Sequence, residues 1–405
     1  MATSVLASRK LRWQVPAGVL GVLILGAGAV WWFGPWSKAW RYQRMDLVTL
    51  RRKADADPKD FEAWREIGLR LARHGDKLAA LPLTQAFALR PSDPYVATAL
   101  GEVLLASDRI PEAFQVLKAA VAHNPNFPLA RMALGRLYQR RSSYLHASEQ
   151  FEALVAVDRN FPEAWFQLAV CYLQMQQSAK AKAAIEEALR QRPEDPSFLA
   201  LKGSVDVAVG EVQNGIAATQ RAAELAPRNL RIQVNFANML LAHHRNPEDL
   251  QRAAAAIARV EQLDPQYPLL PYMRGELERL RGNWAAAARH LEQAVRATPN
   301  QNEVYFALSR TYRRLNRVRE ADRLLEIYRR RQDLERRIDE IRIALGGRPD
   351  DASLYVKLSE LQLQLNDRYG AEDSLKTALQ IRPGDSALQR RLRQLQGPAS
   401  AQEAQ

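Results

Sequence analysis

The chain has 405 residues, of which 47% are hydrophobic and 25% charged, and its formal net charge is +13. These proportions are those of a folded protein with a large core, and they exclude a disordered or collagen-like chain. The single cysteine, Cys171, excludes an internal disulfide and a cysteine zinc site. Its apolar surroundings favour a small buried side chain over a reactive thiol.

The positive charge is concentrated in two segments. Residues 1–53 hold nine lysines and arginines against one acid, Asp46, and residues 310–342 hold twelve arginines against seven acids. The net charges of these segments, +8 and +5, account for the whole excess. A protein that binds nucleic acid along its whole surface would spread its excess charge, so the pattern argues against that class.

The N-terminal part predicts a membrane tether. After a short basic segment, residues 1–14, an uncharged run from Val15 to Phe33 is long enough to cross a bilayer. Trp31, Trp32 and Trp36 flank it as an aromatic belt. We therefore expect a transmembrane signal anchor over residues 15–34, followed by a linker or lead-in helix over residues 35–57.

Two questions about this segment stay open. A cleaved signal peptide is the alternative, with small residues at 26–29 as the cleavage region. Basic residues flank the segment equally on both sides, so they do not fix its orientation. The short acid-free N-terminus favours a cytoplasmic start, which would place the rest of the chain in the periplasm of a bacterium. The alternative is a cytoplasmic location.

From residue 57 onward the chain is repetitive. A Gly, Ala or Ser recurs at spacings of 33, 34, 34, 34, 34, 38, 34 and 50 residues, starting at Gly68 and ending at Ser359. A proline recurs near the end of most units. A period of 34 residues with this punctuation predicts an all-α solenoid of helix–turn–helix units.

The residues around these positions resemble the tetratricopeptide repeat family. The fourth unit carries the full pattern: Trp165, Leu168, Ala169, Tyr172, Ala181, Ile185, Ala188 and Pro193. Large residues on one helix must meet small ones on its neighbour for the backbones to approach. The resemblance implies about nine repeats over residues 58–384 in a right-handed superhelix, and a binding rather than a catalytic role.

Three units depart from the pattern. The fifth has Lys202 and Asp206 at core positions and Gly215 in place of Ala. The seventh has Pro271, Arg274 and Glu278 at core positions. We expect these two to be the loosest joints of the array. The sixth unit has about four extra residues, which we expect in its inter-helix turn around residues 243–249.

The spacing of 50 before the ninth unit predicts one extended helix over residues 317–345. Its second half has Leu334, Ile338, Ile341 and Leu345 at coiled-coil spacing. The extended helix is interpreted either as a solvated helix with alternating charges or as a projecting arm that docks an acidic partner or a partner helix. Contact with nucleic acid or lipid headgroups is a third possibility. A cap helix is expected at 385–396 and a disordered tail at 397–405.

In this family the first helices line a concave groove. The resemblance implies that the groove is lined by Leu69, Tyr95, Leu105, Met132, Phe166, Val170, Leu173, Val234, Leu241, Tyr272, Phe306, Arg310 and Arg313. Such a mixture suits an extended peptide or an amphipathic helix. For each residue the alternative is packing between neighbouring first helices.

No phosphate-binding loop, metal-binding histidine motif or catalytic constellation is present, so we expect no cofactor, no metal and no enzymatic activity. The sequence thus favours a membrane-tethered scaffold that binds protein or peptide segments in assembly of an envelope, secretion or export complex. The alternatives are a polyanion binder acting through the arginine-rich helix at 310–342, and a non-catalytic subunit of an enzyme complex.

Overall fold

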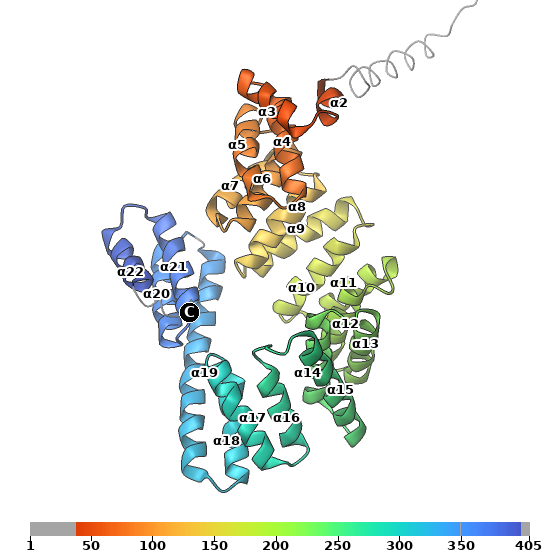
Figure 1. The fold of residues 1–405 in the computed structure, drawn as a ribbon, viewed down its shortest axis with the longest axis vertical. Helices are drawn as coiled ribbons and strands as arrows, with labels where there is room; N and C mark the ends of the chain where they lie inside the picture. The colour runs from red at the N-terminus through yellow and green to blue at the C-terminus, as the bar shows by residue number, and fades with distance from the viewer. Residues whose placement is uncertain (1–37, 349, 398–405) are drawn as a thin grey trace, which may run out of the picture. The chain divides into compact units, whose positions relative to one another are not determined.

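The computed structural model describes residues 38–348 and 350–397 (Figure 1). Within these residues the regular structure is helical and no strand occurs. The helices are α2 (Lys38–Gln43), α3 (Leu47–Ala56), α4 (Phe61–Arg73), η1 (Lys77–Ala79), α5 (Ala80–Leu89), α6 (Pro94–Ala106), α7 (Ile110–His123), α8 (Pro128–Arg140), α9 (Tyr144–Val157), α10 (Pro162–Gln174), α11 (Ser178–Gln191), α12 (Pro196–Ala208), α13 (Val212–Leu225), α14 (Leu230–His243), α15 (Pro247–Leu263), α16 (Leu270–Leu280), α17 (Trp284–Ala297), α18 (Asn302–Arg314), α19 (Val318–Gly347), α20 (Ala352–Gln364), α21 (Arg368–Ile381) and α22 (Ser386–Gln396).

The predicted membrane anchor, with Val15, Trp31, Trp32, Phe33 and Trp36, lies outside the described residues, as do the N-terminal segment 1–14 and most of the predicted tail. Of the helices that the structure does describe, none combines the length and the apolar character that a membrane crossing requires.

Contacts divide the chain into two compact units, Met1–Ala133 and Leu134–Gln405, with the boundary inside α8. In the first unit, α6 and α7 share an apolar cluster around Ala97 and Ala120. In the second, successive hairpins share clusters from α12 through α22. Since each cluster draws on neighbouring hairpins, the helices form a stacked array of the predicted kind.

The small residue at repeat position 8 lies where the two helices of a hairpin are closest. A methyl group added to Gly101 would lie 2.4 Å from the buried side chain of Leu117, and one added to Gly275 would lie 2.6 Å from Leu291. No side chain fits in such a space without movement of the leucine. The predicted meeting of a small residue on the first helix with a large one on the second is therefore confirmed.

Almost every first helix ends at a residue with positive φ. These residues all occupy position 15 of their units and have φ between 55° and 89°: Gly75, Asp108, Ser142, Gln176, Gly210, Gly282, Asn316 and Asn366. A left-handed residue at this place ends the helix and reverses the chain. The repeated turn geometry keeps the hairpins in phase. The sixth unit differs, since His244 at the end of α14 has φ −58°.

The fifth hairpin, α12 and α13, has its two helix backbones in close contact. A methyl group on Gly215 would lie 2.6 Å from the carbonyl oxygen of Gly203 and 2.8 Å from the side chain of Val207. Asp206 is fully buried and forms an ion pair with Lys202 one turn earlier. The expectation of a loose joint is therefore wrong, because the glycines let the helices touch, and Lys202 pairs with Oδ2 of Asp206 while the buried Oδ1 makes no hydrogen bond.

The sixth unit places its extra residues in helices. Its two helices have 14 and 17 residues, whereas those of the fourth unit have 13 and 14. The turn between them is short because the side chain of Asn246 accepts a hydrogen bond from the amide of Asp249 and so begins α15. The prediction of a lengthened turn is therefore wrong.

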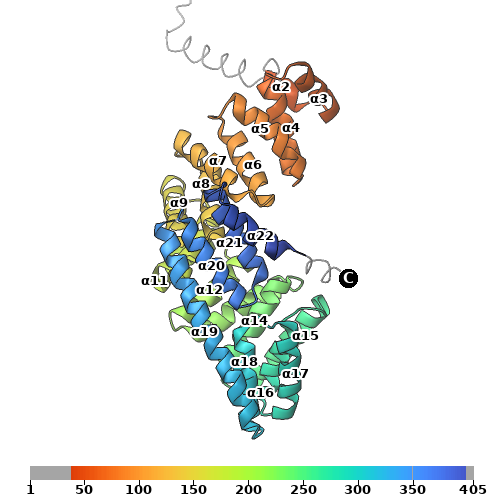
Figure 2. The same ribbon diagram turned by 90° about the vertical axis from the view of Figure 1, so that its left-hand side faces the viewer.

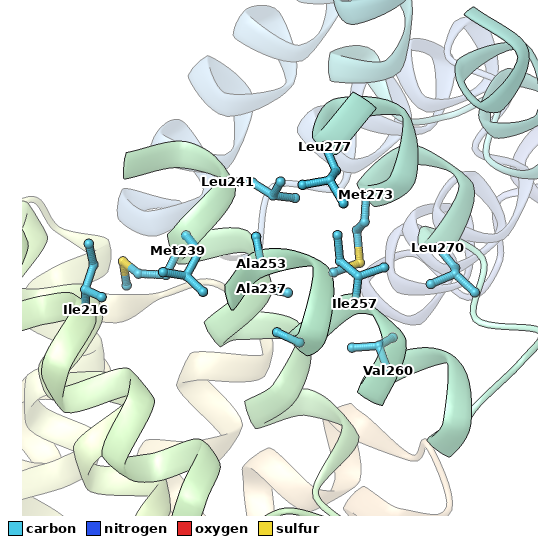
Figure 3. Close-up of a cluster of buried hydrophobic side chains, with 12 residues drawn as sticks. Ile216, Ala237, Met239, Leu241, Ala253, Ile257, Val260, Leu270, Met273 and Leu277 are labelled. Atoms are coloured by element: carbon cyan, nitrogen blue, oxygen red, sulfur yellow. The ribbon is translucent and has the colours of Figure 1, made fainter. Parts of the chain in front are cut away.

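The seventh unit keeps its core at other positions of the repeat. The first helix, α16, buries Leu270, Met273 and Leu277, and the residues equivalent to Leu270 and Leu277 in the fourth unit, Ala164 and Cys171, are buried as well (Figure 3). Met273 and its neighbours pack in a cluster with Ile257 of α15. The expectation of a loose joint is wrong here as well, since these positions supply an apolar core without the residues at 271, 274 and 278.

The extended helix exists as α19, which has 30 residues. Leu334 and Ile338 in its second half are each 5% exposed and pack against Leu358 and Leu361 of α20. Figures 1 and 2 show α18 beside the N-terminal half of α19 and α20 beside its C-terminal half. The interpretation as a free projecting arm is therefore wrong, and the predicted apolar seam is occupied by the chain's own α20.

Further contacts fix the C-terminal hairpin. The cap helix α22 is confirmed, since its Leu388 is buried in a cluster with α20 and α21. The guanidinium of Arg141, in the turn after α8, donates a hydrogen bond of 2.9 Å to the hydroxyl of Tyr355 in α20. The second unit thus joins residues that are 214 positions apart in the sequence.

The lead-in helices α2 and α3 are fixed to the first hairpin by polar contacts. The guanidinium of Arg70 in α4 donates to the carbonyls of Tyr42 and Gln43 at the end of α2 and to that of Met45 in the turn before α3. The Tyr42 hydroxyl donates to Asp60 at 2.6 Å, and burial together with this bond raises the pKa of Tyr42 to about 12. Burial opposes ionisation of Asp60, but bonds from Tyr42 and from Lys38 outweigh it and hold its pKa below the usual value.

Candidate protein-binding surface

The first helices of successive hairpins are in contact with one another. In the second unit α10, α12, α14, α16 and α18 follow each other in this way, and in the first unit α4 contacts α6. Side chains that remain exposed on these helices therefore adjoin from one hairpin to the next within each unit. Such a row of first-helix side chains is the candidate surface.

Most of the predicted lining residues keep some exposure. Leu69, Leu105, Phe166, Val170, Leu173, Val234 and Tyr272 are half-buried, and Tyr95, Phe306, Arg310 and Arg313 are exposed. Two assignments are wrong, because Met132 is 4% and Leu241 8% exposed. Leu241 packs in the cluster between α14 and α16, so it serves contact between neighbouring first helices (Figure 3).

Aromatic rings on these helices are held by other aromatic rings. Phe166 of α10 stacks on Phe198 of α12, with ring centroids 5.1 Å apart. Phe306 of α18 meets Tyr328 of α19 at 5.0 Å. A ring that is already packed on one side loses little conformational freedom when a ligand covers the other side. These residues are therefore suited to bind an apolar side chain of a partner.

Charged groups on the surface are balanced locally. Arg279 donates to both oxygens of Glu276 at 2.7 and 2.9 Å, and Arg313 pairs with Asp322 at 2.8 Å. The guanidinium of Arg310 lies over the ring of Phe306, 5.7 Å from its centroid. A carboxylate partner would have to compete with these internal pairs. The surface therefore favours recognition by shape and apolar contact.

Tyr272 adds a polar group to the row. Burial raises the pKa of its hydroxyl, and the carboxylates of Glu276 and Glu303 raise it further. The hydroxyl thus stays protonated at neutral pH, and it can donate a hydrogen bond to a backbone carbonyl of a bound segment.

A pocket of about 350 Å³ lies between α17, α18 and α19. Its polar groups bind one another: the hydroxyl of Tyr312 donates to Glu292 at 2.7 Å, and the guanidinium of Arg317 lies 3.8 Å from the centre of the Tyr312 ring. Among residues 38–348 and 350–397, no group of three metal-ligating side chains is close enough to hold an ion.

Sequence models of one family match two stretches of the chain. They are models of the tetratricopeptide repeat, and they match residues 143–205 and residues 272–332. The chain is a tetratricopeptide repeat protein. The matched stretches cover hairpins on both sides of the sixth repeat, and the same turn geometry recurs in the described hairpins other than the sixth.

Solved structures of tetratricopeptide repeat proteins are similar to this chain. A tetratricopeptide repeat protein from Parabacteroides merdae has 16% identity and a TM-score of 0.50, over 62% of this chain and 98% of that one. For pilF of Pseudomonas aeruginosa the identity is 20% and the TM-score 0.46, over 56% of this chain and 100% of that one. YrrB, described as a TPR protein with an unusual peptide-binding site, has 20% identity and a TM-score of 0.37, over 46% of this chain and 95% of that one. The similarity to the Parabacteroides merdae protein supports the fold. No curated protein matches the chain.

Sequence reasoning missed two features. Arg331 in α19 is only 9% exposed, and its guanidinium donates to the carbonyls of Asn300 and Leu365. Nothing distinguishes this residue from the other arginines of the segment 310–342. The polar network around Arg70 was missed too, since its partners are backbone carbonyls, which no side-chain pattern reveals.

Proposed function

We propose that this chain is a membrane-tethered scaffold that binds protein or peptide segments on its first helices, in assembly of an envelope complex or of a secretion or export complex. The observation that carries the proposal is the row of half-exposed apolar and aromatic side chains on adjoining first helices of the second unit. Tetratricopeptide repeats support a protein-interaction role. An extended or helical segment would cover these side chains and displace water from them.

The repeat surface can be tested by affinity capture from membranes. We expect the double variant Phe166→Glu and Leu173→Glu to retain its partners about tenfold less well than the original chain, because a buried apolar contact of this kind contributes on the order of 1–2 kcal/mol. Phe166 and Leu173 are half-buried, so the carboxylates of the glutamates that replace them reach solvent without unfolding α10. Recovery of each co-purified protein is measured by quantitative mass spectrometry.

The matched control changes two exposed apolar residues of a second helix, Leu145→Glu and Val157→Glu in α9, which are 59% and 55% exposed. This variant should retain the partners. Equal capture by all three chains would refute the role of α10.

Salt distinguishes the polyanion alternative. Binding through the arginines of residues 310–342 would fall steeply between low and high salt, whereas binding to an apolar surface would change little. Several of these arginines, including Arg317, Arg336 and Arg342, already pair with acids of the same helix. If the chain is a non-catalytic subunit of an enzyme complex, the enzyme should co-purify with it in the same affinity capture.

We further propose that the uncharged run from Val15 to Phe33 anchors the chain in the bacterial inner membrane, with the repeats in the periplasm. In cells with a permeabilised outer membrane and a sealed inner membrane, added protease should degrade the repeats. Protection until the inner membrane is opened would refute this topology and support a cytoplasmic location of the repeats.

A further inference from the structure

We propose that the exposed face of α3, together with the turn between α2 and α3, lies on the headgroup layer of a bilayer that contains anionic lipids. The inference rests on the proposed membrane tether and adds to it a defined contact between the first hairpin and the lipid surface. We call this face the α3 platform; it consists of Arg44, Leu47, Val48, Arg51 and Arg52.

The α3 platform combines apolar and basic side chains on one side of a helix. Leu47 and Val48 are 40% and 63% exposed, while Leu50 and Ala54 on the opposite side are fully buried against the first hairpin. Residues 47, 48, 51 and 52 lie within about half of the helix circumference, since successive residues are rotated by about 100°. An exposed face that mixes aliphatic and arginine side chains is typical of helices that rest on a membrane surface.

The charge of this region complements an anionic surface. Residues 38–57 carry six lysines and arginines against three acids, Asp46, Asp55 and Asp57, and Asp55 lies on the same side of α3 as the platform. Lys38 pairs with Asp60 and Arg51 with Asp55, whereas Arg44 lies over the Trp40 ring at 4.1 Å. An indole beside a guanidinium is a combination favoured at the level of lipid headgroups.

The chain itself limits how far α3 can be from the bilayer. The helix α2 begins at Lys38, five residues after Phe33 at the end of the apolar run. Five extended residues span at most about 18 Å, so the start of α2 stays within that distance of the end of the apolar run, and α3 follows after one short helix and a short turn. This proximity favours lipid over a soluble protein as the partner of the α3 platform.

The α3 platform is also held in one orientation. Arg70 donates to two carbonyls at the end of α2 and to one in the turn before α3, and Asp60 binds both Tyr42 and Lys38 of α2. A surface that is fixed before binding loses little conformational entropy on contact. Contact with lipid would thereby orient the first hairpin relative to the membrane.

The test places an environment-sensitive fluorophore on the full-length variant Val48→Cys, reconstituted into vesicles of phosphatidylcholine alone or with phosphatidylglycerol at 7:3. Lipids with a quencher on the headgroup report proximity. We expect quenching about threefold greater in the anionic vesicles, and a return to the phosphatidylcholine level when Arg51→Glu and Arg52→Glu are added. A probe on the variant Tyr369→Cys, at a position 80% exposed in α21, serves as the control.

The native thiol should not interfere. Cys171 is fully buried, and burial raises the pKa of its thiol to about 11, so it reacts little with a maleimide at neutral pH. The chain without an added cysteine verifies this.

Alkaline extraction separates the two proposals. Release of the chain from the vesicles by carbonate would refute the tether. If the chain resists extraction but the Val48 probe is unquenched in both kinds of vesicle, the α3 platform is wrong while the tether stands. Equal quenching with and without phosphatidylglycerol would refute recognition of anionic lipid.

Discussion

The variant Gly215→Ala is expected to lower the free energy of unfolding of the fifth hairpin by about 1–3 kcal/mol, the range for overpacking in a tight core. The added methyl group would lie 2.6 Å from the carbonyl oxygen of Gly203. A backbone atom cannot rotate away as the end of a side chain can, so α12 and α13 must separate. The neighbouring ion pair of Lys202 and Asp206 would then be opened to water.

Hydrogen exchange is the appropriate measurement, because a repeat array opens locally and its global melting need not be two-state. Amides of α12 and α13 should exchange faster in the variant. The control is Gly346→Ala in the last turn of α19, where a methyl group would meet no atom within 4 Å. It should be neutral or stabilising by up to about 1 kcal/mol, since alanine favours a helix over glycine. Equal exchange in both variants would contradict the close contact.

The variant Arg331→Leu is expected to release the C-terminal hairpin at a cost of about 3 kcal/mol, which is the order of magnitude for a charged group that makes several buried hydrogen bonds. The guanidinium donates to the Asn300 carbonyl at 2.9 Å, to the Asn302 side chain at 3.2 Å and to the Leu365 carbonyl at 3.4 Å. Leucine fills part of the volume but leaves these acceptors without their donor.

The adjacent variant Arg330→Leu provides the control, because Arg330 is exposed on the same helix and the substitution is identical. We expect faster hydrogen exchange in α20, α21 and α22 for Arg331→Leu and no change for Arg330→Leu. If the two variants behave alike, Arg331 does not join α19 to α20.

The sequence revealed those features that every repeat must satisfy in the same way. The small residue at position 8 was predictable because each hairpin brings its helices together there, as Gly101 and Leu117 illustrate. The length of α19 followed from the spacing of 50 residues and from the lack of a helix breaker. Such features recur with the period, so one sequence contains several independent examples of each.

Features that depend on the angle between neighbours were not predictable. Leu241 occupies a lining position, yet it is buried because it packs in the cluster that α14 shares with α16. The burial of Arg331 depends on α20, whose position follows from the docking of a helix further along the chain. The residue pattern of a single repeat contains no information about how neighbouring hairpins pack against one another.

The length of α19 also changes the direction in which the array grows. The 16 residues beyond the usual period advance the helix by about 24 Å and rotate its contact face by about 160°, whereas 18 residues would complete five turns. The last hairpin is therefore added on another flank of α19 than a regular neighbour would be (Figure 1). There Tyr355 meets Arg141, so the second unit returns on itself. A peptide bound along the first helices of the second unit would end at the contact between Tyr355 and Arg141. This contact would therefore limit the length of peptide that the unit can enclose.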